Sequence, residues 1–116
     1  MFEYAPAPES RDIVDIKPSY GLFIDGEFTD TGNHFKTVAP ATEEVLAEIS
    51  EADAADVDRA VAAARRAYES VWSRLPGGER AKYIFRIARI IAERSRELAV
   101  LESIDNGKPI RESRDV

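Results

Sequence analysis

The sequence predicts an α+β fold in which a small antiparallel β-hairpin or meander packs on two long antiparallel helices. Two observations support this prediction. Short, strand-like apolar runs occupy the first half of the chain, at 22–28, 34–38 and 45–50. Two longer stretches, 53–72 and 79–104, then carry apolar residues at three- and four-residue spacing, which is the period of a helix with one buried face.

Length and composition restrict the classes of function. The chain has 116 residues, enough for one modest core, and its 44% hydrophobic and 33% charged residues suit a globular segment. The formal net charge of -6 argues against a nucleic-acid partner, because phosphate binding needs a clustered basic face. No apolar run approaches the roughly 18 residues that a spanning helix needs. The first twelve residues show no basic region followed by an apolar one, so we expect no secretory signal. We therefore expect no membrane partner and a cytoplasmic protein.

The reactive side chains are few. Cysteine is absent, which excludes thiolate nucleophiles, disulfides and cysteine-based metal sites within this chain. His34 is the single histidine, so any Ser-His-Asp triad would have to use it. It lies in a strand-like stretch without a nucleophile elbow, and we expect an exposed strand or turn residue with no catalytic or metal role.

The first half of the chain divides into an arm and three strands. Residues 1–19 contain three of the six prolines among polar residues, which predicts an extended arm. The runs 22–28 and 34–38 are predicted to pair as a hairpin, because the T-D-T-G-N cluster between them supplies residues that tolerate positive φ. Pro40 ends the second strand, and 45–50 is predicted as a third.

The second half is predicted to form two helices. Asp53 is a good N-cap for the first, and Trp72 at its end is expected to plug the junction with the next element. L-P-G-G-E-R then turns the chain, and the second helix runs from about Glu79 to Ile104. Arginines mixed with glutamates cover its polar side, which indicates a face in contact with solvent or a partner.

The segment I-D-N-G-K-P marks the end of the second helix. Gly107 suits a left-handed C′ position, and Pro109 suits the first turn of a further helix over 109–116. Asp105 is unusual there, because a carboxylate in the last turn opposes the helix dipole by about 0.3–1 kcal/mol. Lys108, backbone N–H groups of the turn, or a cation could each offset this cost.

Three stretches together resemble a known family. They are FIDGEF, TVAPATEEVLAEISEADAADVDRAVAAARRAYESVW, and LESIDNGKP. In this order and spacing they resemble the N-terminal segment of the aldehyde dehydrogenase superfamily, from about Leu22 to the end of the chain. The resemblance implies that 20–116 form an incomplete, outer part of an α/β, Rossmann-like cofactor-binding domain.

The resemblance also implies a chemistry. Members of this family oxidise aldehydes to carboxylic acids with NAD or NADP through a catalytic cysteine and a glutamate base. The resemblance places the catalytic residues and the strands that contact the dinucleotide after this segment, and the chain contains no cysteine. We therefore expect no catalytic and no cofactor-binding residue in it and no turnover by it alone.

One family site maps onto this segment. The resemblance implies that Na⁺ or K⁺ is held by the main-chain carbonyls of Thr37 and Val38 and by the carboxylate of Asp105. Such a cation would explain the carboxylate at the helix C-terminus. Ala39 stands where the family usually has an asparagine, which departs from the pattern.

Three interpretations of the whole chain stay open. It is the N-terminal portion of an aldehyde dehydrogenase, as a truncated reading frame or half of a split enzyme, whose partner is the remainder of that polypeptide. Alternatively it is a non-catalytic fragment that binds another protein, or itself, through an exposed helix face, or a decayed gene product without function. That apolar face consists of Ile84, Ile87, Ile91, Leu98 and Leu101.

Overall fold

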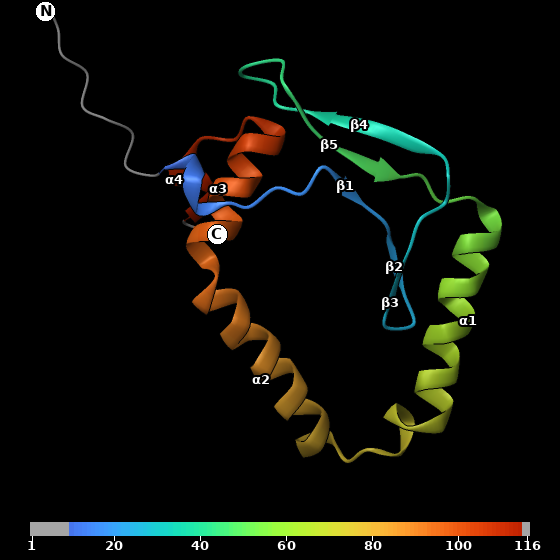
Figure 1. The fold of residues 1–116 in the computed structure, drawn as a ribbon. Helices are drawn as coiled ribbons and strands as arrows, with labels where there is room; N and C mark the ends of the chain where they lie inside the picture. The colour runs from blue at the N-terminus through green and yellow to red at the C-terminus, as the bar shows by residue number, and fades with distance from the viewer. Residues whose placement is uncertain (1–9, 115–116) are drawn as a thin grey trace, which may run out of the picture.

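The computed structural model describes residues 10–114 and shows an α+β protein (Figure 1). In chain order the elements are a 3-10 turn η1 (Arg11–Ile13), β1 (Ser19–Tyr20), β2 (Leu22–Ile24), β3 (Glu27–Thr29), β4 (His34–Val38), β5 (Val45–Ser50), α1 (Ala54–Ser70), η2 (Trp72–Arg74), α2 (Gly77–Glu93), α3 (Ser95–Asn106) and α4 (Ile110–Arg114).

The strands form two small sheets. In the first, β5 lies between β4, with which it pairs antiparallel, and β1, with which it pairs parallel. In the second, β2 and β3 form an antiparallel hairpin of their own. The strands predicted at 34–38 and 45–50 are thus confirmed.

The predicted pairing of 22–28 with 34–38 is wrong. Asp25 and Gly26 both have positive φ, 56° and 84°, and reverse the chain within the first of these runs. Asp-Gly favours this two-residue turn because its twist matches that of the flanking strands. Phe23 and Phe28 consequently face each other across the hairpin, with ring centroids 4.9 Å apart.

The described part of the predicted arm carries more structure than its prolines indicate. Ser10 caps η1, accepting a hydrogen bond from the Asp12 amide at 3.2 Å. The Lys17 amide donates to the Tyr20 hydroxyl at 2.9 Å, next to the point where β1 joins β5. Residues 1–9 lie outside the described part of the chain.

The N-cap prediction for α1 is confirmed. The Asp53 carboxylate accepts a hydrogen bond from the Asp56 amide at 2.8 Å, and the Asp56 carboxylate accepts one from the Asp53 amide at 3.1 Å. This reciprocal capping box satisfies N–H groups that the first helical turn leaves without intrahelical partners.

The single second helix predicted from Glu79 to Ile104 is wrong in two respects. It begins earlier, at Gly77, since the first-turn N–H groups need no helical partner and the turn tolerates glycine. It also breaks at Arg94, whose backbone leaves the helical region at φ -104° and ψ 12°. Ser95, a poor interior helix residue, then begins α3, and Arg94 instead binds Glu97 on the new helix, at 2.5 and 2.9 Å.

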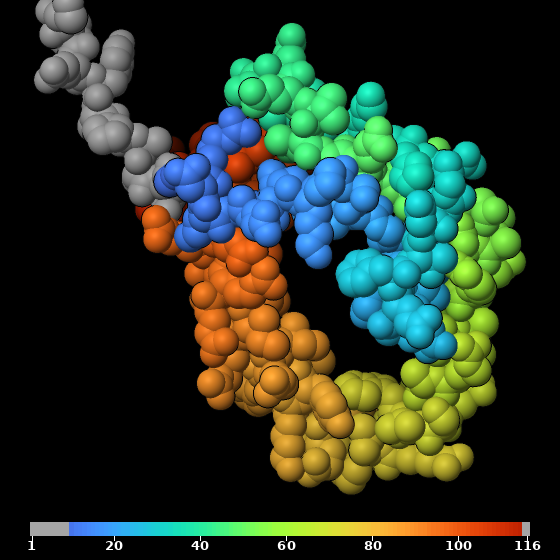
Figure 2. All heavy atoms as spheres, viewed as in Figure 1, coloured from blue at the N-terminus to red at the C-terminus, as the bar shows by residue number. Residues whose placement is uncertain are grey.

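The two long helices do not pack as an antiparallel pair. Figure 1 shows α1 and α2 on opposite sides of an open ring, with η2 at one end and the sheet and α3 at the other. Trp72 lies at the junction as expected, with its ring edge-on to Tyr83 at 5.7 Å. The space-filling view in Figure 2 shows that the ring stays open between α2 and the β2–β3 hairpin.

The core is correspondingly small. Among the described residues, the buried hydrophobic side chains are Ala39, Ala47, Ala63, Ala99 and Val100. None of the large side chains among the described residues is completely buried. The elements therefore hold together by local hydrogen bonding and short contacts, and the large apolar side chains stay on the surface.

Candidate functional site

The structure brings two of the three residues of the expected cation site into contact. Thr37, near the end of β4, donates a hydrogen bond from its hydroxyl to Asp105 Oδ1 in the last turn of α3, at 2.5 Å. This contact joins parts of the chain 68 positions apart. Val38, the third residue, directly follows Thr37 and ends β4.

The strand is irregular at this point. Thr37 pairs with Ala47, but Val38 pairs with Val45, so Leu46 is an extra residue on β5. Such a bulge interrupts the regular ladder and redirects backbone groups near it. The irregularity therefore falls on the two residues whose carbonyl groups the resemblance assigns to the cation.

The surroundings of Asp105 show how its carboxylate is accommodated. Gly107 has φ 77° and caps α3 in the left-handed conformation, as the sequence predicts. Lys108 turns toward Glu102, with its Nζ 3.1 Å from that carboxylate, and its amide donates to the Asn106 side chain at 2.8 Å. The group that contacts Asp105 is thus the Thr37 hydroxyl, which the sequence did not indicate.

The described residues form no cluster typical of a transition-metal site. Within residues 10–114, no three His, Cys, Asp or Glu side chains gather closely enough to hold a metal ion. The contact that the structure does show, between the Thr37 hydroxyl and the Asp105 carboxylate, combines two oxygen groups, the ligand type that hard cations prefer.

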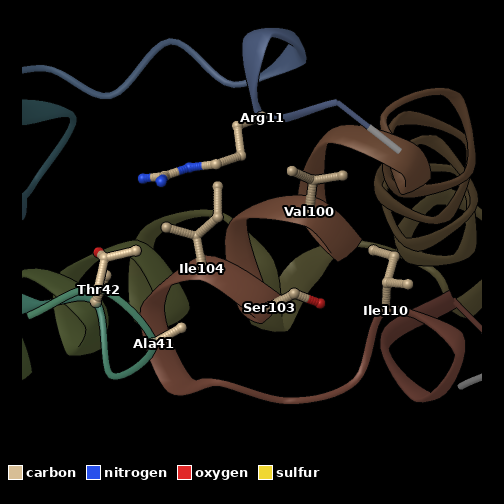
Figure 3. A pocket seen from close by; sticks show the side chains of 8 residues that line it. Arg11, Ala41, Thr42, Val100, Ser103, Ile104 and Ile110 are labelled. Atoms are coloured by element: carbon tan, nitrogen blue, oxygen red, sulfur yellow. The ribbon is translucent and has the colours of Figure 1, made fainter. Parts of the chain in front are cut away.

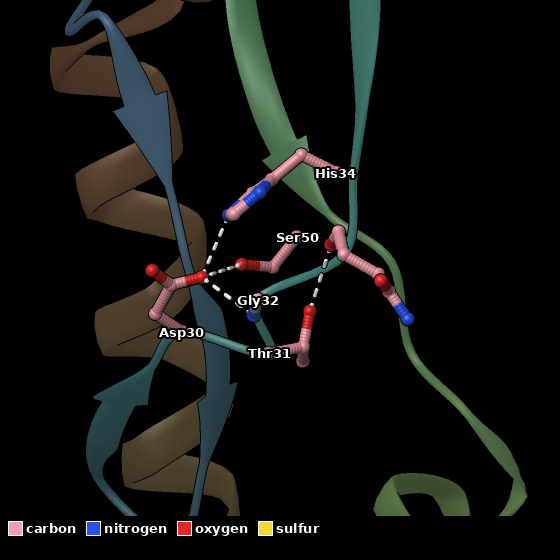
Figure 4. A network of polar contacts seen from close by, with 6 residues as sticks. Asp30, Thr31, Gly32, His34 and Ser50 are labelled. Carbon is pink, nitrogen blue, oxygen red and sulfur yellow. Dashed lines mark hydrogen bonds and ion pairs between the residues drawn. The ribbon is translucent and has the colours of Figure 1, made fainter.

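A second polar cluster centres on Asp30, after β3 (Figure 4). Its Oδ1 accepts hydrogen bonds from the Gly32 amide at 3.2 Å and the Ser50 hydroxyl at 3.1 Å, and lies 2.6 Å from His34 Nε2. The Gly32 amide, then His34 and Ser50, hold the pKa of the Asp30 carboxyl below its ordinary value, because each stabilises the charged form. The D-x-G spacing, typical of an Asx turn, was the available sequence signal.

This cluster contains Asp, His and Ser but lacks the order of a catalytic triad. In a triad the histidine stands between the serine and the carboxylate. Here Asp30 stands between the other two, so Ser50 donates to a carboxylate and has no base beside it. Ser50 is also buried, and the arrangement ties the turn after β3 to β4 and β5.

An apolar cavity lies where η1, the β4–β5 connection, α3 and α4 meet (Figure 3). Its volume is about 270 Å³, and it is lined by Arg11, Ala39, Ala41, Thr42, Val100, Ser103, Ile104 and Ile110. Sequence reasoning missed this cavity, because its walls come from three stretches far apart in the chain, at 11, 39–42 and 100–110.

A further surface feature is an uncovered apolar face on α2. Ile84, Ile87 and Ile91 expose 59%, 54% and 53% of their area and lie on one side of the helix. Among the described residues no helix is long and apolar enough to cross a membrane.

Known proteins resemble this chain in both sequence and structure. The sequence model of the aldehyde dehydrogenase family matches residues 28–115. Aminoacetaldehyde dehydrogenase of Pseudomonas aeruginosa is 48% identical over 113 residues, covering 95% of this chain and 22% of that protein. Aldehyde dehydrogenase 1 of Tanacetum cinerariifolium is 49% identical over 98 residues, covering 82% and 20%. The solved NAD⁺ complex of an aldehyde dehydrogenase from Bacillus cereus superposes with a TM-score of 0.79 at 46% identity, covering 84% and 20%.

The chain therefore belongs to the aldehyde dehydrogenase family. It spans about a fifth of the length of the relatives it matches.

Proposed function

We propose that this chain supplies the outer, N-terminal part of the cofactor-binding domain of an NAD(P)-dependent aldehyde dehydrogenase, which oxidises an aldehyde to a carboxylic acid. The observation that carries the proposal is the uncovered apolar face of α2 on a chain whose matched part covers only 20% of a family relative. In this proposal the remaining polypeptide of such an enzyme, with its Rossmann-like sheet, covers that face.

The energetics support an occupant of this kind. Burial of a large aliphatic side chain contributes about 1.5–3 kcal/mol, and the exposed isoleucines of α2 alone number four: Ile84, Ile87, Ile90 and Ile91. The chain's own core, four alanines and one valine among the described residues, contributes far less. A face of this size in water favours association with another apolar surface.

In this proposal the chain supplies neither the catalytic nucleophile nor the main cofactor contacts. It has no cysteine, so the nucleophile that forms the thiohemiacetal would come from the remaining polypeptide. NAD or NADP would likewise bind mainly to that remainder. The role of this chain would be to cover and brace the cofactor-binding sheet.

A chimera tests the proposal directly. The matching segment of the Pseudomonas aeruginosa aminoacetaldehyde dehydrogenase is replaced by the aligned part of this chain, and NADH formation is measured. We expect activity within about tenfold of the parent enzyme, because a bracing segment of 48% identity contacts no reacting atom. A chimera that folds and binds NAD⁺ but turns over no faster than the segment-deleted enzyme would contradict the proposal.

Matched variants of the chimera identify the face involved. Ile84→Lys with Ile87→Lys should abolish assembly and activity, because the two charges would be buried against the remaining polypeptide. Lys82→Gln with Arg86→Gln alters the polar side of the same helix and should leave the activity close to that of the chimera. The alternative, a chain that acts alone as a helical interaction piece, predicts equal activity for both pairs.

We also propose that Thr37, Val38 and Asp105 hold Na⁺ or K⁺ in the complete protein. The contact of Thr37 with Asp105 and the β5 bulge opposite Thr37 and Val38 support this site. The thermal stability of the chimera should rise when Na⁺ or K⁺ replaces a large organic cation, and Asp105→Ala should remove the rise. An unchanged cation dependence in Asp105→Ala would place the ion elsewhere.

A further inference from the structure

The cavity between η1 and α3 has a chemical character of its own. Five of its lining residues are apolar: Ala39, Ala41, Val100, Ile104 and Ile110. Ala39 and Val100 are almost completely buried, at 3% and 4% exposure, and so form its floor. No carboxylate lines it.

The polar lining groups differ in the hydrogen bonds and charges that they carry. The Ser103 hydroxyl lies 3.0 Å from that of Ser113, and the Thr42 hydroxyl donates to Glu44 at 3.1 Å. Arg11 supplies the one charge among the lining residues. Figure 3 shows its aliphatic part above Ile104 and its guanidinium extending toward Thr42.

Arg11 is only weakly engaged. Its Nη1 lies 3.6 Å from a Glu44 oxygen, and the two side chains are 54% and 64% exposed. Exposed pairs of this kind contribute little, because water solvates both charges well. A carboxylate that approaches in the guanidinium plane would form two parallel hydrogen bonds, the geometry that arginine favours.

The volume limits the size of an occupant. An apolar protein cavity of about 150 Å³ holds benzene, so about 270 Å³ corresponds to roughly ten non-hydrogen atoms. We propose that this cavity binds a small amphiphilic carboxylate, with its head on the Arg11 guanidinium and an apolar tail of about seven carbons against Ile104 and Ile110. This site is separate from the α2 face and does not depend on the proposed enzymatic role.

The test uses octanoate as the probe and the purified 116-residue chain, at a concentration at which sedimentation shows a monomer, with backbone amide NMR shifts as the readout. Binding should shift the amides of Ala41, Ile104 and Ile110 along one saturable curve. 1-Octanol and octylamine, which share the tail and lack the carboxylate, should bind at least about tenfold more weakly, since each forfeits a charge-assisted hydrogen bond.

Two variants and one control locate the site. Arg11→Gln should weaken octanoate binding about tenfold and leave 1-octanol binding unchanged. Ala41→Leu, which fills the cavity from the β4–β5 connection, should weaken both ligands. Arg65→Gln removes an exposed cation on α1, far along the chain from the cavity, and should change neither.

Three results would overturn the proposal. Equal affinity for octanoate and 1-octanol would show that the charge plays no part. Shifts centred on Ile84, Ile87 and Ile91 would show adsorption to the α2 face instead. An absence of saturable shifts in a chain whose amide spectrum is well dispersed would show that the cavity binds no such ligand.

Discussion

The hydroxyl of Thr37 donates a hydrogen bond to Asp105 Oδ1 at 2.5 Å and thereby joins β4 to the last turn of α3. The same region contains the left-handed Gly107, whose Cα faces the Pro40 ring. Two features that the sequence presents separately, a strand end and a helix end, thus form one structural joint.

This joint should contribute measurably to stability. Thr37→Val removes the donor, and we expect the free energy of unfolding to fall by about 1 kcal/mol, as for a single hydrogen bond to a partly exposed carboxylate. Asp105→Ala should cost less, because it also removes a carboxylate from the negative end of the α3 dipole. The double variant should cost less than the sum of the two, because the two residues share one interaction. Urea unfolding of the four proteins measures the coupling, and strictly additive losses would show that the contact contributes nothing.

Asp30 predicts a pH dependence. Its folded-state pKa lies below the ordinary value of 3.8 because the Gly32 amide, His34 and Ser50 stabilise the charged carboxylate. Its contribution to stability is therefore complete above pH 3.8 and is lost as the pH falls through the folded-state pKa.

The urea concentration at the unfolding midpoint of the wild-type chain should thus decrease as the pH is lowered through this acidic range. Asp30→Asn should make the midpoint depend less on pH there. Asp58→Asn, which changes an exposed carboxylate on α1, is the matched control and should keep the wild-type slope. If the midpoint of Asp30→Asn depended on pH as steeply as that of the wild type, the Asp30 cluster would not contribute to acid unfolding.

Gly107 should tolerate substitution poorly for a conformational reason. A Cβ atom there would meet the Pro40 side chain at 3.5 Å, an ordinary contact, so the cost comes from the φ of 77°. We expect Gly107→Ala to lower the free energy of unfolding by about 1–2 kcal/mol, and Gly107→Asn by less, because asparagine adopts this conformation more readily.

Gly78→Ala is the control for Gly107→Ala. It lies in the first turn of α2 with nothing within 4 Å of the added Cβ. This substitution should stabilise the chain by about 0.4–1 kcal/mol by restricting the unfolded state. Equal losses at the two glycines would refute the conformational explanation.

The uncovered face of α2 should make the isolated chain self-associate. Sedimentation velocity over a concentration series should show larger species for the wild type, and Ile87→Lys with Ile91→Lys should shift the distribution toward the monomer. Arg86→Gln with Arg89→Gln changes the polar side and should leave association intact. If the wild-type chain stayed monomeric at every concentration, the prediction would be wrong. The chain would then have to rearrange so that it covers the α2 face itself.

The elements predicted correctly are those with local physical causes. Asp53 caps α1 because its carboxylate reaches an amide three residues away, and Gly107 ends α3 because only its own backbone has to be left-handed. The strands at 34–38 and 45–50 likewise follow from their own apolar, extended character. Each of these signals acts within about four residues and can be recognised in the sequence without knowledge of the fold.

The tertiary structure decided which of these elements meet. The Asp25-Gly26 turn separates β2 from β3 and frees β4 to pair with β5, while β1 joins the other edge of β5. The Asp30 cluster, the Arg11 cavity and the Thr37–Asp105 contact each combine segments that lie apart in sequence. They form only when segments far apart in the sequence pack against one another. Local propensity carries no information about such long-range packing, so the sequence did not predict them.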